Sequence, residues 1–591
     1  MLLGIVVSWF LAAAFGIGLA NQGYYPVSLL QDEFQGPVDF SCLNNPLKAS
    51  DQLFVKEGRF FKVGQDLRPN TPDDERVRLF GVNMTFGANF PAEEDAVRVA
   101  KRLRRLGVNL VRFHHLDTRP NADIQDLESI LTKGAYPTFN TLSLRSLKRF
   151  IDALKAEGIY IDINLHVGYQ FRPSIDKIPA MPDGVEFPRH SKPLQIFYPR
   201  MIELQKVFAK GLLDSLELSH DSVVAAIEIN NESSLIDAWQ KGKLESLVQG
   251  EYKRELIRQW IDYQKTNKSE VIDSLIHVGD KVDNSRKEEF IMFLVSLDKA
   301  YLTQLKQVIH KAVNPLTPVG GTQMNYGGLL NFDSHADMGF QDRHLYVDHY
   351  NFPHDRWDWQ DWTILNFSSV GSNLIGMLNA AASRQGGVPF CVTEYNQPWP
   401  NMQGAEIVPL MASFAAFQDW DAVVYFDYSS SRDWDAKIPR GFDLNGDWSK
   451  LANFGQAAWL FRAGVIDTAK TTIGIPVSKE LRLKSAEERM NGRIAHYLNK
   501  VFSYRPELAL RHRIELLVDS QEKMPQFQLD QITNRHISDT GQIVLDSDRK
   551  ILTVQADKAA GIFGFVPSKQ RVAAGDVTFR FTESKDRFIS L

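Results

Sequence analysis

The sequence contains few cysteines, and its net charge is small. The chain has 591 residues and two cysteines, Cys42 and Cys391, which excludes a disulfide framework or a cysteine-ligated zinc module. The sequence leaves open whether these two pair, because a bridge requires Cα atoms within about 7 Å of each other. Lysine and arginine total 67 and aspartate and glutamate total 72, so the formal net charge is −5. We therefore expect no nucleic-acid partner, since no excess of positive charge is available for a phosphate backbone.

Internal repeats and low-complexity segments are also absent, which excludes solenoid and array architectures. Apolar residues make up 44% of the chain and charged residues 24%, as in soluble globular proteins. The 37 phenylalanines, 17 tyrosines and 11 tryptophans can bury ample surface, so disorder is excluded as well. Length alone predicts about three or four units, although one barrel domain with insertions can exceed about 400 residues.

The single long apolar run stands at the N-terminus, over residues 2–20, and ends in Gly18-Leu19-Ala20. Small residues therefore occupy the two positions that a signal peptidase reads. We interpret residues 1–20 as a secretory signal and expect a secreted or periplasmic protein. The alternative is an uncleaved membrane anchor formed by residues 2–20, because a run of this length can span a bilayer and no lysine or arginine precedes it.

Two patterns follow this run. Residues 21–76 form a turn-rich segment with a short hairpin around Glu57-Gly58. Residues 77–465 alternate apolar strands with amphipathic helices, which predicts a parallel sheet with helices outside it, and a long charged helical insertion interrupts them at about 236–313. Eight strands favour a (β/α)8 TIM barrel over an open sheet. We place them at 79–83, 108–113, 159–165, 223–229, 318–322, 344–350, 389–394 and 422–428.

A third pattern occupies residues 466–591, where short strands alternate with Asp, Gly and Ser turns. This predicts a separate, sandwich-like all-β domain after the barrel. The expected strands include residues 493–498, 542–545, 551–554 and 577–581.

Two of the predicted barrel strands end in glutamate. The fourth strand runs into Asn231-Glu232, and the seventh ends in Thr393-Glu394. The working face of a barrel is the C-terminal end of its strands, and strands four and seven lie nearly opposite each other. Two facing carboxylates are what retaining glycoside hydrolysis needs, namely a nucleophile and an acid that protonates the leaving oxygen. The alternative for a single glutamate is a carboxylate that caps the next helix.

Other strand ends bring polar side chains to the same mouth. Arg112 and His114 lie on the second strand, His166 on the third, and His349 and Tyr350 on the sixth. An inward polar row is costly unless it is hydrogen-bonded or functional, so we expect these residues to border a site.

Tryptophans are concentrated in the loops after strands six and seven. Trp399 follows Glu394 closely, and we expect it to stack on a sugar ring. For Trp357, Trp359 and Trp362, a packed lid over the barrel is an equal alternative to sugar binding.

These segments resemble clan A of the glycoside hydrolases, in particular the cellulase-like family 5 branch and its large uncharacterised bacterial relatives. The resemblance rests on Asn231-Glu232 and on Thr393-Glu394-Tyr395-Asn396, and it covers about residues 77–465. It implies that Glu232 is the acid/base, that Glu394 is the nucleophile and that Asn231 holds the sugar 2-hydroxyl.

The same resemblance implies that Arg112 supports the charge of the nucleophile and that His166, His349 and Tyr350 border the −1 site. The chain departs from the family at the eighth strand, where Tyr425-Phe426-Asp427-Tyr428 stands in place of the usual tryptophan. The floor of the −1 site is therefore expected to differ from that of the cellulases.

Two other functions stay open. A metal-dependent barrel hydrolase could use histidine ligands, although strand one has no His-x-His and no HExxH helix is present. A non-catalytic carbohydrate-binding protein would use the same aromatics without opposed carboxylates. The glycosidase chemistry uses carboxyl groups and water, so we expect no metal or nucleotide cofactor. The sugar, its linkage, exo or endo action and the oligomeric state are not specified by the sequence. The candidate metal ligands are His114, His115, His166, His344 and His349.

Overall fold

A computed structural model describes residues 38–371, 374–524, 534–566, 568, 570–580 and 587–590. The predicted signal at 1–20, its alternative as an anchor and the start of the N-terminal segment lie outside the described residues. Among the described residues, no helix combines the length and the apolar character that a membrane crossing requires.

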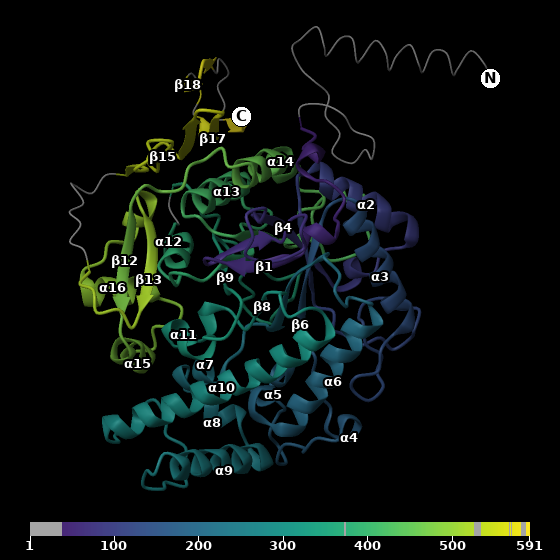
Figure 1. Ribbon diagram of the computed structural model, residues 1–591, viewed down its shortest axis with the longest axis vertical. Helices are drawn as coiled ribbons and strands as arrows, with labels where there is room; N and C mark the ends of the chain where they lie inside the picture. The colour runs from purple at the N-terminus through teal and green to yellow at the C-terminus, as the bar shows by residue number, and fades with distance from the viewer. Residues whose placement is uncertain are drawn as a thin grey trace.

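The centre of the molecule is a sheet of eight parallel strands in the order β8-β7-β6-β5-β4-β11-β10-β9 (Figure 1). The first and last strands in sequence, β4 and β11, pair with each other and so curl the sheet into a barrel. Every residue of β4, β6, β7 and β10 is buried, because one face of each strand fills the barrel and the other meets helices. The strands are β4 (Leu79–Thr85), β5 (Leu110–His114), β6 (Tyr160–His166), β7 (Val224–Asn230), β8 (Val319–Gly320), β9 (Gln341–Tyr346), β10 (Phe390–Asn396) and β11 (Ala422–Ser429).

Helices follow most of these strands and cover the outside of the barrel. The stretch between β7 and β8 is helical, and its long helix α10 packs against α6 and α7. The predicted (β/α)8 barrel is thereby confirmed. The helices of this part are α2 (Glu93–Arg105), α3 (Thr141–Ala156), α4 (Pro173–Asp176), α5 (Leu194–Phe197), α6 (Pro199–Ser215), α7 (Leu235–Gln240), α8 (Leu244–Leu247), α9 (Gly250–Thr266), α10 (Asn284–Ala312), α11 (Asn331–Ser334), α12 (Ile375–Ala381), α13 (Ile407–Phe417) and α14 (Trp448–Arg462).

A hairpin of β1 (Leu53–Lys56) and β2 (Arg59–Lys62), joined by β3 (Glu75–Arg76), covers one end of the barrel. Leu53 and Phe60 of this hairpin belong to one buried cluster with Leu79 and Leu110, which begin strands β4 and β5. The hairpin therefore closes the N-terminal end of the barrel and leaves the C-terminal end for chemistry.

The chain after the barrel begins with a mixed unit. Strands β12 (Thr472–Val477) and β13 (Arg513–Val518) pair in parallel, with α15 (Lys479–Glu487) and α16 (Ile494–Phe502) between them. The expected strand at 493–498 is wrong, because residues 494, 495, 497 and 498 share one helical face and are all buried there.

The C-terminal β domain follows this unit. An antiparallel sheet has the order β14-β15-β16-β17-β20, and β18 and β19 form a separate hairpin. A barrel with a C-terminal β domain is thus confirmed, but the antiparallel sheet begins at Arg535 rather than near residue 466. Both cysteines are free, with Cys42 exposed and Cys391 buried on β10. The strands are β14 (Arg535–Ile537), β15 (Ile543–Asp546), β16 (Ile551–Ala556), β17 (Ala559–Val566), β18 (Arg571–Ala574), β19 (Val577–Arg580) and β20 (Arg587–Ser590).

Candidate active site

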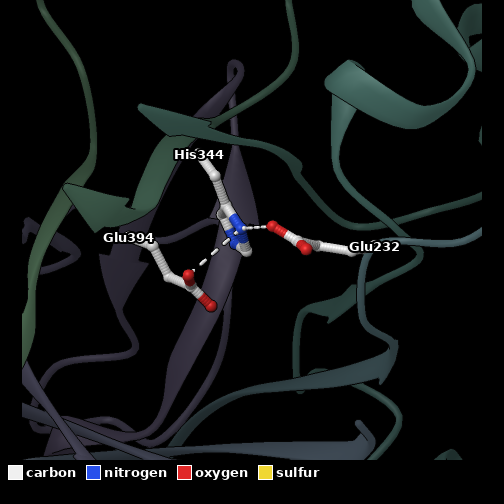
Figure 2. A group of neighbouring side chains, drawn as sticks. All are labelled: Glu232, His344 and Glu394. Carbon is white, nitrogen blue, oxygen red and sulfur yellow. Dashed lines mark hydrogen bonds and ion pairs between the residues drawn. The ribbon is translucent and has the colours of Figure 1, made fainter. Parts of the chain in front are cut away.

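Glu232 and Glu394 meet at the C-terminal end of the barrel (Figure 2). Glu394 lies inside β10, and Glu232 lies just past the end of β7. One carboxylate oxygen of each lies within 4.8 Å of the other. The Glu394 side chain is 5% exposed, whereas the Glu232 side chain is 34% exposed. The pair therefore has a buried member and a member that solvent reaches.

The turn that carries Glu232 is fixed by hydrogen bonds on both sides. Glu232 has a left-handed backbone with φ 50°, and its N–H donates to Oε1 of Gln323 at 2.7 Å. Helix α7 starts three residues later, at Leu235, and its N-cap residue Ser234 accepts through Oγ from the Asp237 N–H at 2.9 Å. Asp298 of α10 accepts from the N–H of Leu235 at 3.1 Å. The helical insertion thus orients the loop that presents Glu232.

Arg112 holds the Glu394 carboxylate by a hydrogen bond. Its Nη1 donates to Glu394 Oε1 at 3.0 Å and to Asn83 Oδ1 at 2.8 Å. Its Nε and Nη2 donate to the two oxygens of Glu228 at 3.0 and 2.6 Å. Arg112 is fully buried, and these carboxylates outweigh the cost of burial and raise its pKa. Charge-assisted, bidentate bonds of this kind fix orientation as well as charge. Glu228 lies too deep in the barrel to act with Glu232, and instead it holds the guanidinium group of Arg112.

Tyr346 and His114 complete the surroundings of Glu394. The Tyr346 hydroxyl donates to Glu394 Oε2 at 2.7 Å, so each carboxylate oxygen has its own donor. His114 Nε2 lies 3.5 Å from Glu394 Oε1, and burial together with nearby positive charges lowers its pKa well below the usual value. His114 is therefore a neutral neighbour of the carboxylate.

His344 stands between the two glutamates, as Figure 2 shows. Its Nδ1 lies 2.9 Å from Glu232 Oε1 and 3.3 Å from Glu394 Oε2, and its Nε2 lies 3.2 Å from Thr393 Oγ1. Burial opposes its charge, but Glu394, Asp342 and Glu232 outweigh burial and raise the pKa of His344 to about 10. The free site thus holds an imidazolium between two carboxyl groups.

His344 affects the two glutamates unequally. Burial raises the pKa of Glu232, but the hydrogen bond and charge of His344, with the charge of Lys192, outweigh burial and lower that pKa to about 2. For Glu394, burial outweighs the attraction of His344 and Arg112, and its pKa is raised. In the free site Glu232 is consequently the more strongly ionised of the two.

The strand predicted at 344–350 is misplaced. Strand β9 spans Gln341–Tyr346, so the side chains that reach Glu394 from this strand are those of His344 and Tyr346. The polar residues Gln341, Asp342 and Arg343 look like loop in the sequence, yet all three are buried in β9. The spacing of two between His344 and Tyr346, which places both on one face of a strand, is the signal that could have identified them.

His349 and Tyr350 lie beyond the end of β9 and outside the immediate shell of the glutamates. The His349 ring packs on Phe442, with centroids 5.2 Å apart. The Tyr350 hydroxyl donates to the carbonyl oxygens of Trp399 and Gly441. Within the described part of the chain, the hydrogen bonds recorded for the carboxylates of Glu232 and Glu394 do not involve them.

Asn231 and His166 lie beside Glu232 with unused polar atoms. The Asn231 N–H donates to the His166 carbonyl at 3.0 Å. Asn231 Oδ1 and His166 Nε2 are buried and have no hydrogen-bond partner among the described residues. Trp399 lies in the chain after β10 and is 40% exposed.

The two glutamates and His344 also form a group that could hold a metal ion. One oxygen of Glu232, one nitrogen of His344 and one oxygen of Glu394 all lie within 4.8 Å of one another. Carboxylate and imidazole ligands suit zinc in three-ligand sites with an open position. Of the histidines considered as ligands in the sequence, His344 alone belongs to this group.

Comparison with known proteins identifies a fold. No family model and no curated protein matches the sequence. A β-galactosidase from the haloarchaeon Halorubrum lacusprofundi is similar, with a TM-score of 0.50 at 15% identity over 74% of this chain and 66% of that one. An endo-1,4-β-mannanase from Rhizomucor miehei has a TM-score of 0.42 at 13% identity over 69% of this chain and 99% of that one. The chain therefore shares a barrel fold with this β-galactosidase, the fold that the sequence resemblance implied.

Proposed function

We propose that the protein is a retaining glycoside hydrolase that cleaves β-glycosidic bonds of a poly- or oligosaccharide by double displacement. The observation that carries this proposal is the approach of the Glu232 and Glu394 oxygens to within 4.8 Å. Retaining enzymes have carboxyl groups about 5–5.5 Å apart, whereas inverting enzymes need about 6.5–9.5 Å to admit a water. The approach of these two oxygens supports the retaining arrangement.

Glu394 is the nucleophile in this proposal. Arg112 and Tyr346 each donate to one of its oxygens, which fixes the carboxylate beneath the sugar. Attack by Glu394 on the anomeric carbon forms a glycosyl ester and expels the leaving oxygen, and water later cleaves that ester. The charges of His344 and Arg112 favour the ionised form of Glu394 and oppose the burial that raises its pKa.

Glu232 is the acid/base, and it must carry a proton when the bond breaks. His344 Nδ1 lies 2.9 Å from Glu232 Oε1, so its proton is the nearest one available. Once protonated, Glu232 passes its proton to the leaving oxygen. In the second step Glu232 takes a proton from the attacking water. Its 34% exposed side chain supports this exchange with water.

A metal-dependent hydrolase is the second candidate. The grouping of Glu232, His344 and Glu394 favours it, since these residues supply a carboxylate–imidazole–carboxylate set. In that case the ion would occupy the space between the glutamates where the glycosidase binds the anomeric carbon. The site could therefore not perform both functions at the same time.

One experiment separates these candidates. Chromogenic β-glycosides and a panel of polysaccharides are incubated with the protein with and without a chelator, and the first-formed anomer is read by proton NMR. We expect hydrolysis that the chelator leaves unchanged and a product that retains the anomeric configuration of the substrate. An inverted product would reject double displacement. Activity that is lost on chelation and restored by a divalent ion would support the metal-dependent hydrolase.

A further inference from the structure

A loop of basic residues lies directly beside Glu232. The segment Arg189-His190-Ser191-Lys192 follows strand β6. The Lys192 ammonium donates to the main-chain oxygen of Asn231, the residue that precedes Glu232. A positive charge is therefore held within one residue of the proposed acid/base.

The loop is fixed in an unfavourable backbone conformation. His190 has φ 53° and Ser191 has φ 60°, a left-handed region that residues other than glycine seldom occupy. Ser191 Oγ accepts from the Phe171 N–H at 2.8 Å, and Gln170 donates to the Pro188 carbonyl at 3.0 Å. These bonds attach the loop to the segment after β6, so its side chains are positioned before any ligand arrives.

The cations of this loop form no recorded ion pair among the described residues. Among the ion pairs of the described residues, none involves Arg189 or Lys192, whereas Arg112 and Arg172 each pair with a carboxylate. The carboxylates that act on Lys192 most strongly are Glu232 and Asp117. Asp117 already accepts from the N–H groups of residues 167, 168 and 169 at 3.0–3.2 Å.

The surroundings of the loop have a positive potential. Burial, together with the charges of Lys192, Arg189 and Arg356, lowers the pKa of His190 to about 4. Burial lowers the pKa of Lys192 to about 8, so it is still mostly charged at pH 7.

We propose that this loop binds a negatively charged group of the carbohydrate, a carboxylate or a sulfate ester, and that the substrate is an acidic poly- or oligosaccharide. The inference rests on the proposed glycosidase function. Arg189 is exposed and reaches solvent, Lys192 is half-buried beside Asn231, and both can donate to an anionic oxygen. The unpartnered Asn231 Oδ1 and His166 Nε2 next to them accept or donate to neighbouring sugar hydroxyls.

Binding of small sugars tests the inference without turnover. The probes are D-glucuronate, D-glucose 6-sulfate and D-glucose, titrated by calorimetry at one low ionic strength into the full chain. We expect at least one charged sugar to bind wild-type protein about tenfold or more tighter than glucose. Preference for glucuronate would identify a carboxylate as the group recognised, and preference for the sulfate would identify a sulfate ester.

Three variants define the site. Lys192→Met and Arg189→Gln should each weaken binding of the charged sugar by about 10- to 100-fold, the value of a lost charge-assisted hydrogen bond, and leave glucose unchanged. Arg189 is exposed, so its variant keeps the test valid if Lys192→Met fails to fold. Lys101→Gln, an exposed lysine on α2, is the matched control and should bind like wild type. Equal binding of all three sugars, or unchanged binding in both loop variants, would overturn the inference.

Hydrolysis assays distinguish a failure of the proposed anion site from a failure of the proposed glycosidase function. Uronate-containing and sulfated polysaccharides are compared with their carboxyl-reduced and desulfated forms. Faster hydrolysis of the charged members supports both proposals. Hydrolysis of neutral members alone, with kcat/KM unchanged in Lys192→Met, rejects the anion site and keeps the glycosidase. Tight binding of charged sugars without any hydrolysis rejects the glycosidase and keeps the anion site.

Discussion

Glu394 is held by buried donors on both oxygens, whereas Glu232 stands at the edge of the mouth between His344 and a loop of basic residues. The side chain of Glu394 is 5% exposed and that of Glu232 is 34% exposed, although their oxygens lie within 4.8 Å. A nucleophile must keep one orientation toward a single carbon atom. An acid/base must exchange protons with a leaving group and with water. The difference between the two surroundings matches the difference between the two proposed roles.

The largest expected effect comes from the buried side. Glu394→Ala should abolish turnover on every substrate, by about 10⁴-fold or more, because no other carboxylate can form the glycosyl ester. Initial rates on aryl glycosides with good and poor leaving groups measure this. Glu406→Gln, a buried glutamate that accepts from Ser368, is a control for loss of a buried carboxylate outside the site. Turnover that survives in Glu394→Ala would remove the nucleophile from its proposed position.

The exposed side should give a loss that depends on the substrate. Glu232→Ala should reduce turnover by about 10²–10⁴-fold on poor leaving groups, the usual value of general acid catalysis, and far less on good ones. External azide should partly restore its activity, since the space left by the side chain opens toward solvent. If Glu232→Ala loses the same factor on good and poor leaving groups, the roles of the two glutamates are reversed or wrong.

His344 connects the two sides, and pH should reveal its charge. Its folded-state pKa of about 10 is above the ordinary value of 6.5, so its stabilising effect is complete below pH 6.5 and is lost as pH rises through 10. We expect His344→Gln to lower the free energy of unfolding by on the order of 3 kcal/mol at pH 6, and by much less near pH 10. Urea titrations of both proteins across this range measure the difference. A gap that stays constant with pH would show that His344 is neutral.

The same contrast between buried and exposed surroundings decides what could be predicted from the sequence. Barrel strands such as β4, β7 and β10 are buried on both faces, so they appear as apolar runs whose ends could be located. Glu232, Glu394 and Arg112 were expected at the mouth and lie together there, while their chemical roles stay predictions.

Strands that are buried but polar cannot be located as apolar runs in the sequence. Asp342 on β9 accepts from the N–H of Thr393 at 3.0 Å and from its hydroxyl at 2.6 Å. Such partners come from distant parts of the chain, so a single sequence cannot show that a polar segment is internal. The predicted sixth strand therefore lies too late in the chain, and the contacts of His344 and Tyr346 with Glu394 were not predicted. Helix α16 was missed for another reason, since a short apolar cluster fits both a strand and a helix face.

Trp399 gives the smallest expected effect. It follows β10, the strand of Glu394, yet its side chain is 40% exposed at the rim, and its one recorded bond, from Tyr350, uses the main chain. Trp399→Ala should therefore leave stability nearly unchanged and raise KM about fivefold, the order of one aromatic contact, on substrates long enough to reach the rim. Trp359→Ala is the matched control, because its ring packs 5.0 Å from Tyr350 and 5.4 Å from Phe352. That variant should lower the melting temperature instead. An unchanged KM in Trp399→Ala for short and long substrates alike would show that sugar binding ends inside the mouth, near the glutamates.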